Sequence, residues 1–584
     1  MLARGLGLSV RGVKAPCRVL NRDELHARGL TVDFDATEAG HQVGRPPMDE
    51  RAAIELAALE VLYPLAEGTL GGAQGRFVDR LQAIMQESAN WPAARQSPDW
   101  HTFGGNPARS KIVPREIDPA GRPLWSCSLP QLAARNESLR RGRLLPADDA
   151  RSLLSYHPVV FGQTVLVKVD ALGDSHVVAL DLRTGQRLWQ ADHSRGLSAE
   201  ARSGASGGDP SPAAGKLRAE PARQAGIVRH TLSATGNTVF ARADSPAAAP
   251  SVRQAPASAT EEQGALLGLD IASQGQPLVG FPIYPPSNEW TFEGTPLSDG
   301  NALYVAMRRA RGGQSQLHVA AFELQSAAAR SSEHSPNSRP TGRLKWQTRI
   351  CSSATPSGGE ADQRSHLLVT LDSGRIYLNT SAGAVAALNA ADGRLLWVLK
   401  YPRAAAGTGV PTAQRWFRDL TPCLAAKDLL IVSPADCRQI FAADAASGQL
   451  AWALPPGAAD DAMHLLGVQN DVLLASGDAL YWIDACTGRL LTQFPRGQPG
   501  GAAQAVPMPR GFGRGVLAGG NVWWPTRESI FVFAAEPLTT DFGRQPRLVR
   551  EIPLAPRGLT GGNLVLAGGV LLIAGGDRLV ALGE

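Results

Sequence analysis

Short apolar runs alternate with tight turns along most of the chain. The stretch 157–170 (HPVVFGQTVLVKVD) is representative, because two apolar runs flank a turn that contains glycine. The stretches 420–434 and 465–478 repeat this arrangement with Lys-Asp and Asn-Asp at the turn. Runs of this length, rich in Val, Leu, Ile and Ala and bounded by turn residues, are typical of buried β-strands. The pattern therefore predicts antiparallel strand pairs.

A second hairpin follows each of these pairs and carries a recurring motif, Asp-x-x-[Thr/Ser]-Gly. The short Asp side chain can accept hydrogen bonds from N–H groups of the turn, and glycine tolerates the positive φ that a tight turn requires. Asn389 replaces the aspartate in one copy, and Asp270 to Gly275 carries one extra residue. The other defining positions are Asp181, Asp444, Asp484, Gly185, Gly393, Gly448 and Gly488.

A tryptophan stands four residues after the glycine position in several copies. These residues are Trp125, Trp189, Trp346, Trp397 and Trp452, and three further equivalents have lost the ring at Val279, Thr492 and Val549. A repeated tryptophan can belong to a cofactor cage or to the packing between repeats. A buried indole removes so much apolar surface from water that packing explains the pattern without a ligand. We therefore interpret these residues as structural.

The repeat predicts an all-β fold, an eight-bladed β-propeller of four-stranded antiparallel blades, with seven blades as the alternative because the 512–553 unit is degenerate. Residues 561–584 supply three strands and 121–130 supply an isolated fourth. An eighth blade built from both ends of the chain would close the ring without a free sheet edge. The other predicted blades are 155–192, 229–284, 291–350, 366–401, 417–455, 463–495 and 512–553.

The first hundred residues differ from the rest. Apolar residues at helical spacing predict helices at 49–65 and 74–89, and so a helical hairpin over 49–92 that precedes a propeller spanning 100–584. Residues 1–48 show little periodicity and are expected to be poorly ordered. Three segments rich in Ala, Ser, Pro and Gly are predicted to be surface insertions, namely 194–226, 245–263 and 325–340.

Charge and cysteine content add few constraints. The formal net charge is +5, and the one basic cluster, 135–145, is expected to be a solvated loop, so no nucleic-acid partner is predicted. No transmembrane segment is predicted, and the first residues lack the apolar run of a signal peptide. The six cysteines form no C-x-x-C motif. Cys423 and Cys437 share a predicted blade and are interpreted as unpaired thiols, with a disulfide as the alternative.

The strand–Asp-x-x-Thr-Gly-x-x-Leu-Trp unit resembles the repeat of pyrroloquinoline-quinone (PQQ) propellers, the quinoprotein alcohol dehydrogenase-like superfamily, over about 120–584. The lead-in at 100–114 (WHTFGGNPARSKIVP) resembles the sequence that precedes such propellers in bacterial proteins. In this family the repeated tryptophan docks on the neighbouring blade, and the catalytic members bind PQQ beside Ca²⁺ and in many cases carry adjacent cysteines.

The sequence lacks adjacent cysteines, and the aspartates of the motif are assigned to turns. Glu293, Asn379 and Asn521 could face the axis, and Trp523 with Trp524 are weak candidates for a cofactor-stacking surface, although blade packing with one exposed ring is the preferred interpretation. The histidines form no metal-binding motif, and "GFGRG" (511–515) lacks the helix of a phosphate site.

We therefore expect no catalytic, cofactor or metal residues. The predicted function is a non-catalytic, monomeric scaffold for protein partners in the cell envelope, as in the outer-membrane assembly propeller lipoproteins, which carry this repeat without a quinone. The alternative is a PQQ/Ca²⁺-dependent dehydrogenase that oxidises an alcohol or a sugar. Localisation would be periplasmic or in the envelope if a signal segment precedes this sequence, and cytoplasmic otherwise.

Overall fold

The computed structural model describes most of the chain with interruptions. The described residues are 56–57, 59–70, 73–88, 97–119, 122–130, 154–171, 174–192, 229–243, 264–287, 289–311, 314–324, 343–354, 366–403, 420–495, 508–541 and 543–583. They fall into two compact units, Met1–Ser97 and Pro98–Glu584. The predicted disorder of 1–48 and the insertions 194–226, 245–263 and 325–340 lie wholly or almost wholly outside the described residues.

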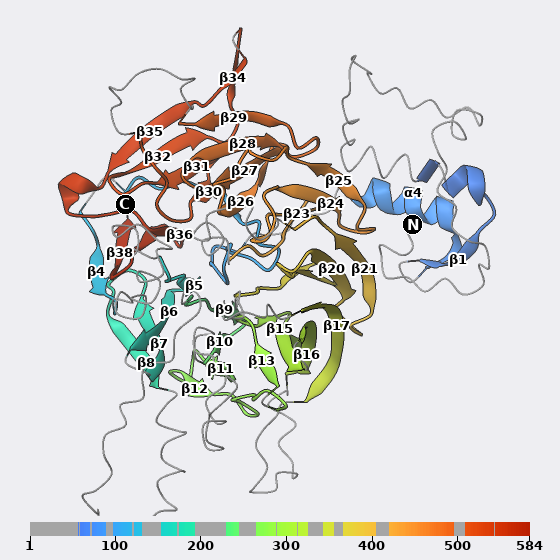
Figure 1. The fold of residues 1–584 in the computed structure, drawn as a ribbon, viewed down its shortest axis with the longest axis horizontal. Coiled ribbons are helices and arrows are strands. Elements are labelled where there is room, and N and C mark those ends of the chain that lie inside the picture. Colours follow the sequence, from blue (N-terminus) through green and yellow to red (C-terminus); the bar gives the residue numbers. More distant parts are fainter. Residues whose placement is uncertain are drawn as a thin grey trace, which may run out of the picture. The chain divides into compact units, whose positions relative to one another are not determined.

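The second unit is an eight-bladed β-propeller of small antiparallel sheets, as the repeat predicts (Figure 1). Blade 1 contains β5 (Val159–Phe161), β6 (Thr164–Ala171), β7 (Asp174–Asp181) and β8 (Arg187–Asp192), and blade 2 contains β9 (Ser233–Thr235), β10 (Thr238–Arg242), β11 (Leu266–Asp270) and β12 (Gln276–Pro277). Blade 3 contains β13 (Trp290–Phe292), β14 (Leu297–Ser298), β15 (Ala302–Arg311), β16 (Gln314–Glu323) and β17 (Leu344–Ala354). Blade 4 contains β18 (Thr370–Asp372), β19 (Arg375–Asn379), β20 (Ala384–Asn389) and β21 (Leu395–Lys400).

Blades 5 to 8 follow the same order from the axis outward. Blade 5 contains β22 (Leu424–Ala426), β23 (Leu429–Val432), β24 (Phe441–Asp444) and β25 (Leu450–Ala453), and blade 6 contains β26 (His464–Gln469), β27 (Val472–Ser476), β28 (Leu480–Asp484) and β29 (Leu490–Phe494). Blade 7 contains β30 (Val516–Ala518), β31 (Asn521–Pro525), β32 (Ser529–Ala534) and β35 (Leu548–Pro553). Blade 8 contains β36 (Asn563–Ala567), β37 (Val570–Ala574), β38 (Arg578–Gly583) and β4 (Trp125–Ser128). A small hairpin, β33 (Leu538–Thr540) and β34 (Gly543–Gln545), interrupts blade 7, and the 3-10 helix η4 (Ala555–Arg557) follows it.

The two ends of the propeller chain meet in blade 8. Strand β4 pairs antiparallel with β38, so that Ser126 lies opposite Val580 and Cys127 opposite Leu579. The sheet that β36, β37 and β38 begin is therefore completed by a strand from the start of the unit. This arrangement leaves no gap in the ring and confirms eight blades over seven.

The recurring aspartate closes the turn between the third and fourth strands. Asp444 is typical, because its Oδ1 accepts hydrogen bonds from the N–H groups of Ala446 (3.0 Å) and Ser447 (2.7 Å). Gly448 ends this turn with φ at +73°, a conformation that glycine adopts without strain. Asp181, Asp270, Asn389 and Asp484 accept equivalent bonds.

The recurring tryptophan locks each blade to the next. Trp452 on β25 is fully buried, and its indole N–H donates to the carbonyl of Ala485 in blade 6 (2.8 Å). Its ring covers Gly488, where an added Cβ would lie 2.5 Å from the ring. The same ring-on-glycine contact joins Trp125 to Gly185, Trp189 to Gly275, Trp346 to Gly393 and Trp397 to Gly448.

Two positions that have lost the tryptophan show how the contact is replaced. Thr492 lies directly opposite Trp482 in blade 6, and the Trp482 indole donates to the carbonyl of Ala534 in blade 7 (3.1 Å). The tryptophan that makes this contact therefore stands on β28 instead of β29, on the same face of the sheet. In blade 7 the predicted equivalent, Val549, is wrong by one residue, because Arg550 lies opposite Val532 beside the bulge, just as Trp452 lies opposite Ala442 beside the bulge of blade 5.

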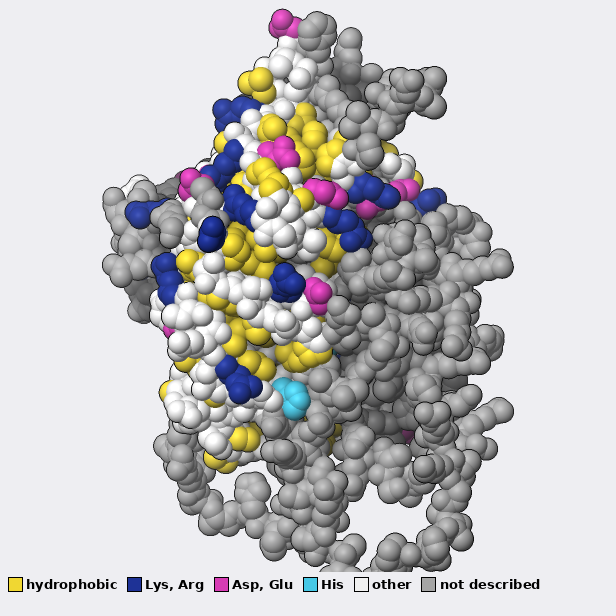
Figure 2. Space-filling view, turned by 90° about the vertical axis from the view of Figure 1, so that its left-hand side faces the viewer, with side chains coloured by type: hydrophobic (Ala, Val, Ile, Leu, Met, Phe, Trp, Pro, Cys, Tyr) yellow, Lys and Arg dark blue, Asp and Glu magenta, His cyan; other side chains and the backbone are white. Residues whose placement is uncertain are grey.

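The outer strands form the rim of the ring, where blades diverge and apolar side chains are partly exposed. Half-exposed examples are Leu188 on β8, Leu450 on β25, and Leu548 and Val549 on β35. On the side of the molecule shown in Figure 2, apolar, basic and acidic side chains are interspersed over the described surface. The described surface on this side is thus mixed, and charges of one sign are not gathered there.

The first unit contains a short hairpin and a helix. Strands β1 (Glu67–Leu70) and β2 (Ala73–Arg76) pair antiparallel, and α4 (Phe77–Ser88) follows and buries Val78 and Leu81 with Leu56. α4 falls within the predicted helix 74–89. The hairpin occupies the predicted link and also residues 74–76, so the predicted helix begins too early, because these glycine-containing strands lack an apolar alternation. Within the part of the chain that the structure describes, no helix has the length and apolar content needed to span a bilayer.

Candidate functional site

The middle of the ring is occupied by the chain itself. Residues 98–119, here called the axial segment, precede β4 and run along the inner strands at the centre of Figure 1. The middle residue of four inner strands donates its N–H to a carbonyl of this segment: Val160 to Trp100 (2.9 Å), Ala234 to His101 (2.7 Å), Leu371 to Pro107 (3.0 Å) and Ala425 to Ala108 (3.0 Å). Strand β3 (Ile112–Val113) then pairs in parallel with β30. The axial segment therefore satisfies the inward-facing edges of five blades.

Arg109 holds the axial segment in place. Its guanidinium donates to Thr102 Oγ1 (2.6 Å) and to the carbonyls of Phe103 (2.7 Å) and Val369 (2.7 Å), the last of which precedes β18. The backbone of Arg109 has φ at +64°, the left-handed region that non-glycine residues rarely adopt. The surrounding contacts impose a strained conformation that directs this side chain into the buried centre.

Cationic and imidazole side chains surround Phe103 at the axis. The rings of Phe103 and His157 meet edge to face at 5.1 Å, and the Arg514 guanidinium lies 5.3 Å from the Phe103 centroid. His157 and Arg514 occur where the inner strands of blades 1 and 7 begin, and His366 and His464 occur at the same end of blades 4 and 6. We call Phe103, Arg109, His157, His366, His464 and Arg514 the axial hub.

Burial controls the charge state of the axial hub. Desolvation, with smaller contributions from nearby cations, places the pKa of His157 and His366 well below its ordinary value. The same causes lower the pKa of His464 to about 3. Burial and Arg514 lower the pKa of Arg109 to about 9, and burial lowers the pKa of Arg514 to about 10. At neutral pH the histidines are therefore neutral and both guanidinium groups remain charged.

The residues at the axis do not fit PQQ with its Ca²⁺. The cavity at the hub, between Phe103, Arg109, His464 and Arg514, measures about 10 Å³, room for one water-sized species. A cofactor as large as PQQ needs a site of several hundred Å³. Among the described residues, no group of three or more His, Cys, Asp or Glu is arranged to hold a metal ion. No step of quinone chemistry can be assigned to these side chains.

A larger groove of about 470 Å³ lies at blade 6, lined by Asp461, Asp478, Met508 and Arg510 among others. Its carboxylates are already engaged. Asp461 accepts from the N–H of Ala479 and from the Tyr481 hydroxyl, and Asp478 pairs with Arg510. The groove therefore lacks the free converging oxygen ligands that Ca²⁺ requires.

Trp523 and Trp524 form no stacking surface. Both rings are fully buried, so the expectation of one exposed ring is wrong. Successive residues of a strand point to opposite faces. Trp523 accordingly packs in the cluster that joins blades 7, 8 and 1, whereas Trp524 packs against Leu474 and Trp482 of blade 6.

The three other axis candidates take structural roles. Glu293 is buried and forms an ion pair with Arg308 (2.9 Å). Asn379 donates to the carbonyl of Thr421 (3.1 Å), and Asn521 bonds to Glu116 at the end of the axial segment. These side chains belong to separate contacts, within blade 3 for Glu293, between blades for Asn379 and with the axial segment for Asn521, and they do not converge on one point.

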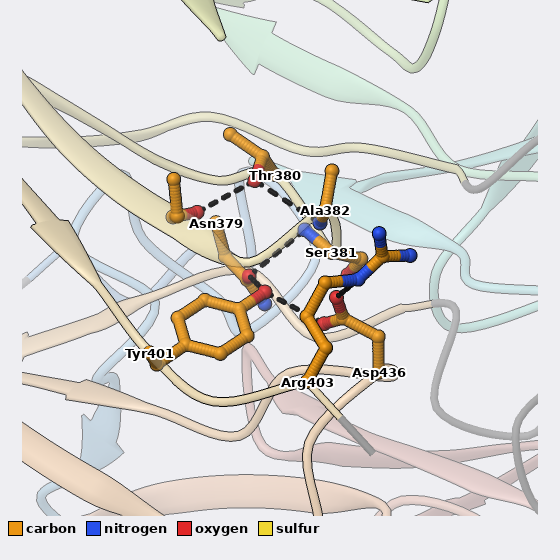
Figure 3. A network of polar contacts seen from close by, with 8 residues as sticks. Asn379, Thr380, Ser381, Ala382, Tyr401, Arg403 and Asp436 are labelled. Atoms are coloured by element: carbon orange, nitrogen blue, oxygen red, sulfur yellow. Dashed lines mark hydrogen bonds and ion pairs between the residues drawn. The ribbon is translucent and has the colours of Figure 1, made fainter. Parts of the chain in front are cut away.

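A buried polar network joins blades 4 and 5 (Figure 3). Asp436, between β23 and β24, accepts from the Tyr401 hydroxyl (2.6 Å) and from Arg403 Nε (2.9 Å), and both donors follow β21. Burial and the Asp436 carboxylate raise the pKa of Tyr401 well above its ordinary value, so the hydroxyl keeps its proton and donates. Asn379 accepts from the N–H of Ser381 (3.1 Å) beside this pair. The network fixes two neighbouring blades.

Tyr401→Phe is expected to lower the free energy of unfolding by about 1.5 kcal/mol, because it removes a hydrogen bond to a buried carboxylate that Arg403 still partly compensates. Chemical denaturation measures this change. Tyr304→Phe is the matched control, since the Tyr304 hydroxyl donates to the exposed Asp299 (2.8 Å) and should cost less. Equal losses in the two variants would contradict a specific role for the buried network.

Cys423 and Cys437 are both buried, and no disulfide joins them. They lie in one apolar cluster of blades 4 and 5, and burial raises the pKa of the Cys423 thiol far above its ordinary value. The interpretation as unpaired thiols agrees with the structure. An unreactive buried thiol supplies no nucleophile.

The sequence placed the repeat residues correctly but did not indicate the axial hub. The structure brings the repeat residues together in pairs of one tryptophan and one glycine, distributed around the ring rather than in one site. The axial hub combines residues from blades 1, 4, 6 and 7 with the axial segment, and the histidines share no sequence motif. The one available signal was position, since His157, His464 and Arg514 each precede an inner strand.

Comparison with known proteins identifies the repeat. A family model described as outer membrane protein assembly factor BamB matches residues 293–420 and 337–524, which lie in blades 3 to 7. No curated protein matches the sequence significantly.

Many solved structures resemble the fold at low identity. A quinohemoprotein alcohol dehydrogenase from Comamonas testosteroni is 13% identical, with 84% of this chain and 82% of that chain covered and a TM-score of 0.48. BamB from Moraxella catarrhalis is 12% identical, with coverages of 72% and 82% and a TM-score of 0.30. The computationally designed protein Ika8 is 13% identical, with coverages of 80% and 100% and a TM-score of 0.41. No activity follows from these likenesses.

Proposed function

We propose that this chain, a PQQ-like β-propeller, is a non-catalytic scaffold that binds protein partners and holds no quinone. The closed axis is the observation that supports this most directly. In the propeller's centre the axial segment bonds to the inner strands of blades 1, 2, 4, 5 and 7, and only about 10 Å³ remains beside Arg109, His464 and Arg514. Function on such a frame must reside on its outer surfaces.

The rim offers suitable contact area. Leu188, Leu450, Leu548 and Val549 are each about half exposed on outer strands. Partly exposed apolar residues within a polar surround are typical of protein interfaces. The family description refers to outer-membrane assembly, and we infer by this likeness that the scaffold works in the cell envelope.

Reconstitution with PQQ and Ca²⁺ tests the proposal. The purified protein is expected to retain no quinone absorbance after desalting and to show no dye-linked oxidation of alcohols or sugars, because the axial segment occupies the place of the cofactor. A PQQ-dependent dehydrogenase treated identically serves as the positive control. Stoichiometric quinone retention with substrate-dependent dye reduction would overturn the proposal in favour of a PQQ/Ca²⁺-dependent dehydrogenase.

Photo-crosslinking in native cells tests the partner directly. A photoreactive residue is placed at Leu548 on the rim, at Gln163 in the turn between β5 and β6, or at Arg510 between blades 6 and 7. These positions sample the rim and the two ends of the ring. At least one position is expected to give a discrete protein adduct that the other two lack. Absence of any adduct at all three would count against a scaffold.

A further inference from the structure

Two buried guanidinium groups share the cavity of the axial hub. Arg109 and Arg514 are only 3% and 4% exposed, and both line the cavity of about 10 Å³ together with His464. Neither arginine forms an ion pair with a carboxylate in the part of the chain that the structure describes. Their terminal nitrogens bond to Thr102 Oγ1 and to backbone carbonyls, those of Phe103 and Val369 for Arg109 and those of Gly515, Leu465 and Leu466 for Arg514.

Three side-chain nitrogen atoms on these cavity-lining residues, two of them guanidinium donors, lack a hydrogen-bond partner among the described residues. The Nε atoms of Arg109 and Arg514 and Nδ1 of His464 are buried without a hydrogen bond. An unsatisfied buried donor on a charged group is costly, and buried charges are normally paired or neutralised. Two like charges from different parts of the chain therefore line a common cavity and carry unused donors. This arrangement indicates that a negatively charged hydrogen-bond acceptor is missing.

We propose that this cavity binds one monatomic anion, chloride under ordinary conditions, between Arg109, Arg514 and His464. The size of the cavity excludes polyatomic anions such as sulfate, phosphate and carboxylates. A water molecule could fill the same space but would leave both charges uncompensated. The ion is structural and lies apart from any partner-binding surface.

The ion would connect three parts of the propeller. Arg109 belongs to the axial segment, His464 begins β26 of blade 6, and Arg514 precedes β30 of blade 7. Chloride would thus help to fix the axial segment against the inner strands. The left-handed backbone of Arg109, which directs its guanidinium to the buried centre, is explained by this role.

Thermal unfolding in chloride and in gluconate at equal ionic strength tests the site. The unfolding midpoint is expected to rise by about 2–3 °C when chloride reaches a hundred times its dissociation constant, because only the folded state binds the ion. Bromide should act like chloride, and sulfate should not beyond its general salt effect. An identical midpoint in chloride and gluconate would overturn the proposal and leave water as the occupant.

Variants and diffraction supply independent readouts. Arg514→Met is expected to abolish the difference between chloride and gluconate, while Arg578→Met on the exposed start of β38 should preserve it. Because Arg514→Met could fail to fold, crystals of the unaltered protein soaked in bromide provide the second measurement. An anomalous peak beside Arg109, His464 and Arg514 is expected, and its absence at full bromide exchange would contradict the site.

Discussion

Replacing Trp452 with alanine is expected to lower the free energy of unfolding by about 3–5 kcal/mol, the range for truncating a fully buried aromatic side chain. The substitution leaves a cavity between blades 5 and 6, uncovers Gly488 and removes the donor to the Ala485 carbonyl. Chemical denaturation followed by tryptophan-independent circular dichroism measures the loss. No other side chain of blade 5 spans this contact with a comparable ring.

Two further variants separate the contributions. Trp452→Phe keeps a ring against Gly488 but removes the N–H donor, so it should lose clearly less than alanine. Trp397→Ala removes an equivalent but half-buried ring and should also cost less than Trp452→Ala. A Trp452→Ala protein with an unchanged unfolding midpoint would show that the repeated tryptophan does not hold the blades together.

Acidification from pH 6.5 to pH 5 is expected to reduce the free energy of unfolding through His157 and His366, by at most about 3 kcal/mol, the limit for two rings that stay neutral in the native state. Both have native pKa values well below the unfolded value of about 6.5. The unfolded state therefore binds protons that the native state rejects. This contribution to the free energy of unfolding is present above about pH 6.5 and is lost as the pH falls below it. His464, whose pKa is lowered to about 3, adds to the same trend.

Burial and then the neighbouring charged groups explain why His157 and His366 resist protonation. Arg229, Arg514, His464 and His366 oppose a charge on His157, and Arg242, Lys168, Arg229 and His230 oppose one on His366. Denaturation at several pH values gives the number of protons taken up on unfolding. The double variant His157→Gln, His366→Gln should flatten the dependence below pH 6.5. An unchanged slope in that variant would exclude these residues as the source.

The propeller was predictable because its information is local and repeated. Each Asp-x-x-Thr-Gly turn and each tryptophan specifies its own hairpin, so blade number follows from reading the same short pattern along the chain. Where the pattern weakens, local reading fails by small steps. In blade 7 the hairpin of β33 and β34 stands between β32 and β35 in place of the motif turn, so counting from that motif misses by one residue and Arg550 rather than Val549 takes the tryptophan position.

The centre of the molecule was not predictable in this way. The carbonyls of Trp100 and Ala108 accept bonds from β5 and β22, which follow them by very different lengths of chain, and no side-chain pattern encodes backbone pairing. The burial of Trp523 and Trp524 follows from neighbouring blades on either side, which a run of two tryptophans does not reveal. The axial hub combines side chains from four blades and the axial segment, and these become a cluster only after the ring has closed.

The pairing of β4 with β38 has a consequence for synthesis. Strand β4 leaves the ribosome early but is the outermost strand of the last blade, so it lacks its partner until β38 has been synthesised. Contacts between such distant parts of a chain form slowly. Until then the growing protein exposes an unpaired edge that is prone to association. We expect shortened products that end before β36 to need chaperone protection or to aggregate, whereas a chain that contains β36, β37 and β38 can complete blade 8 and close the ring.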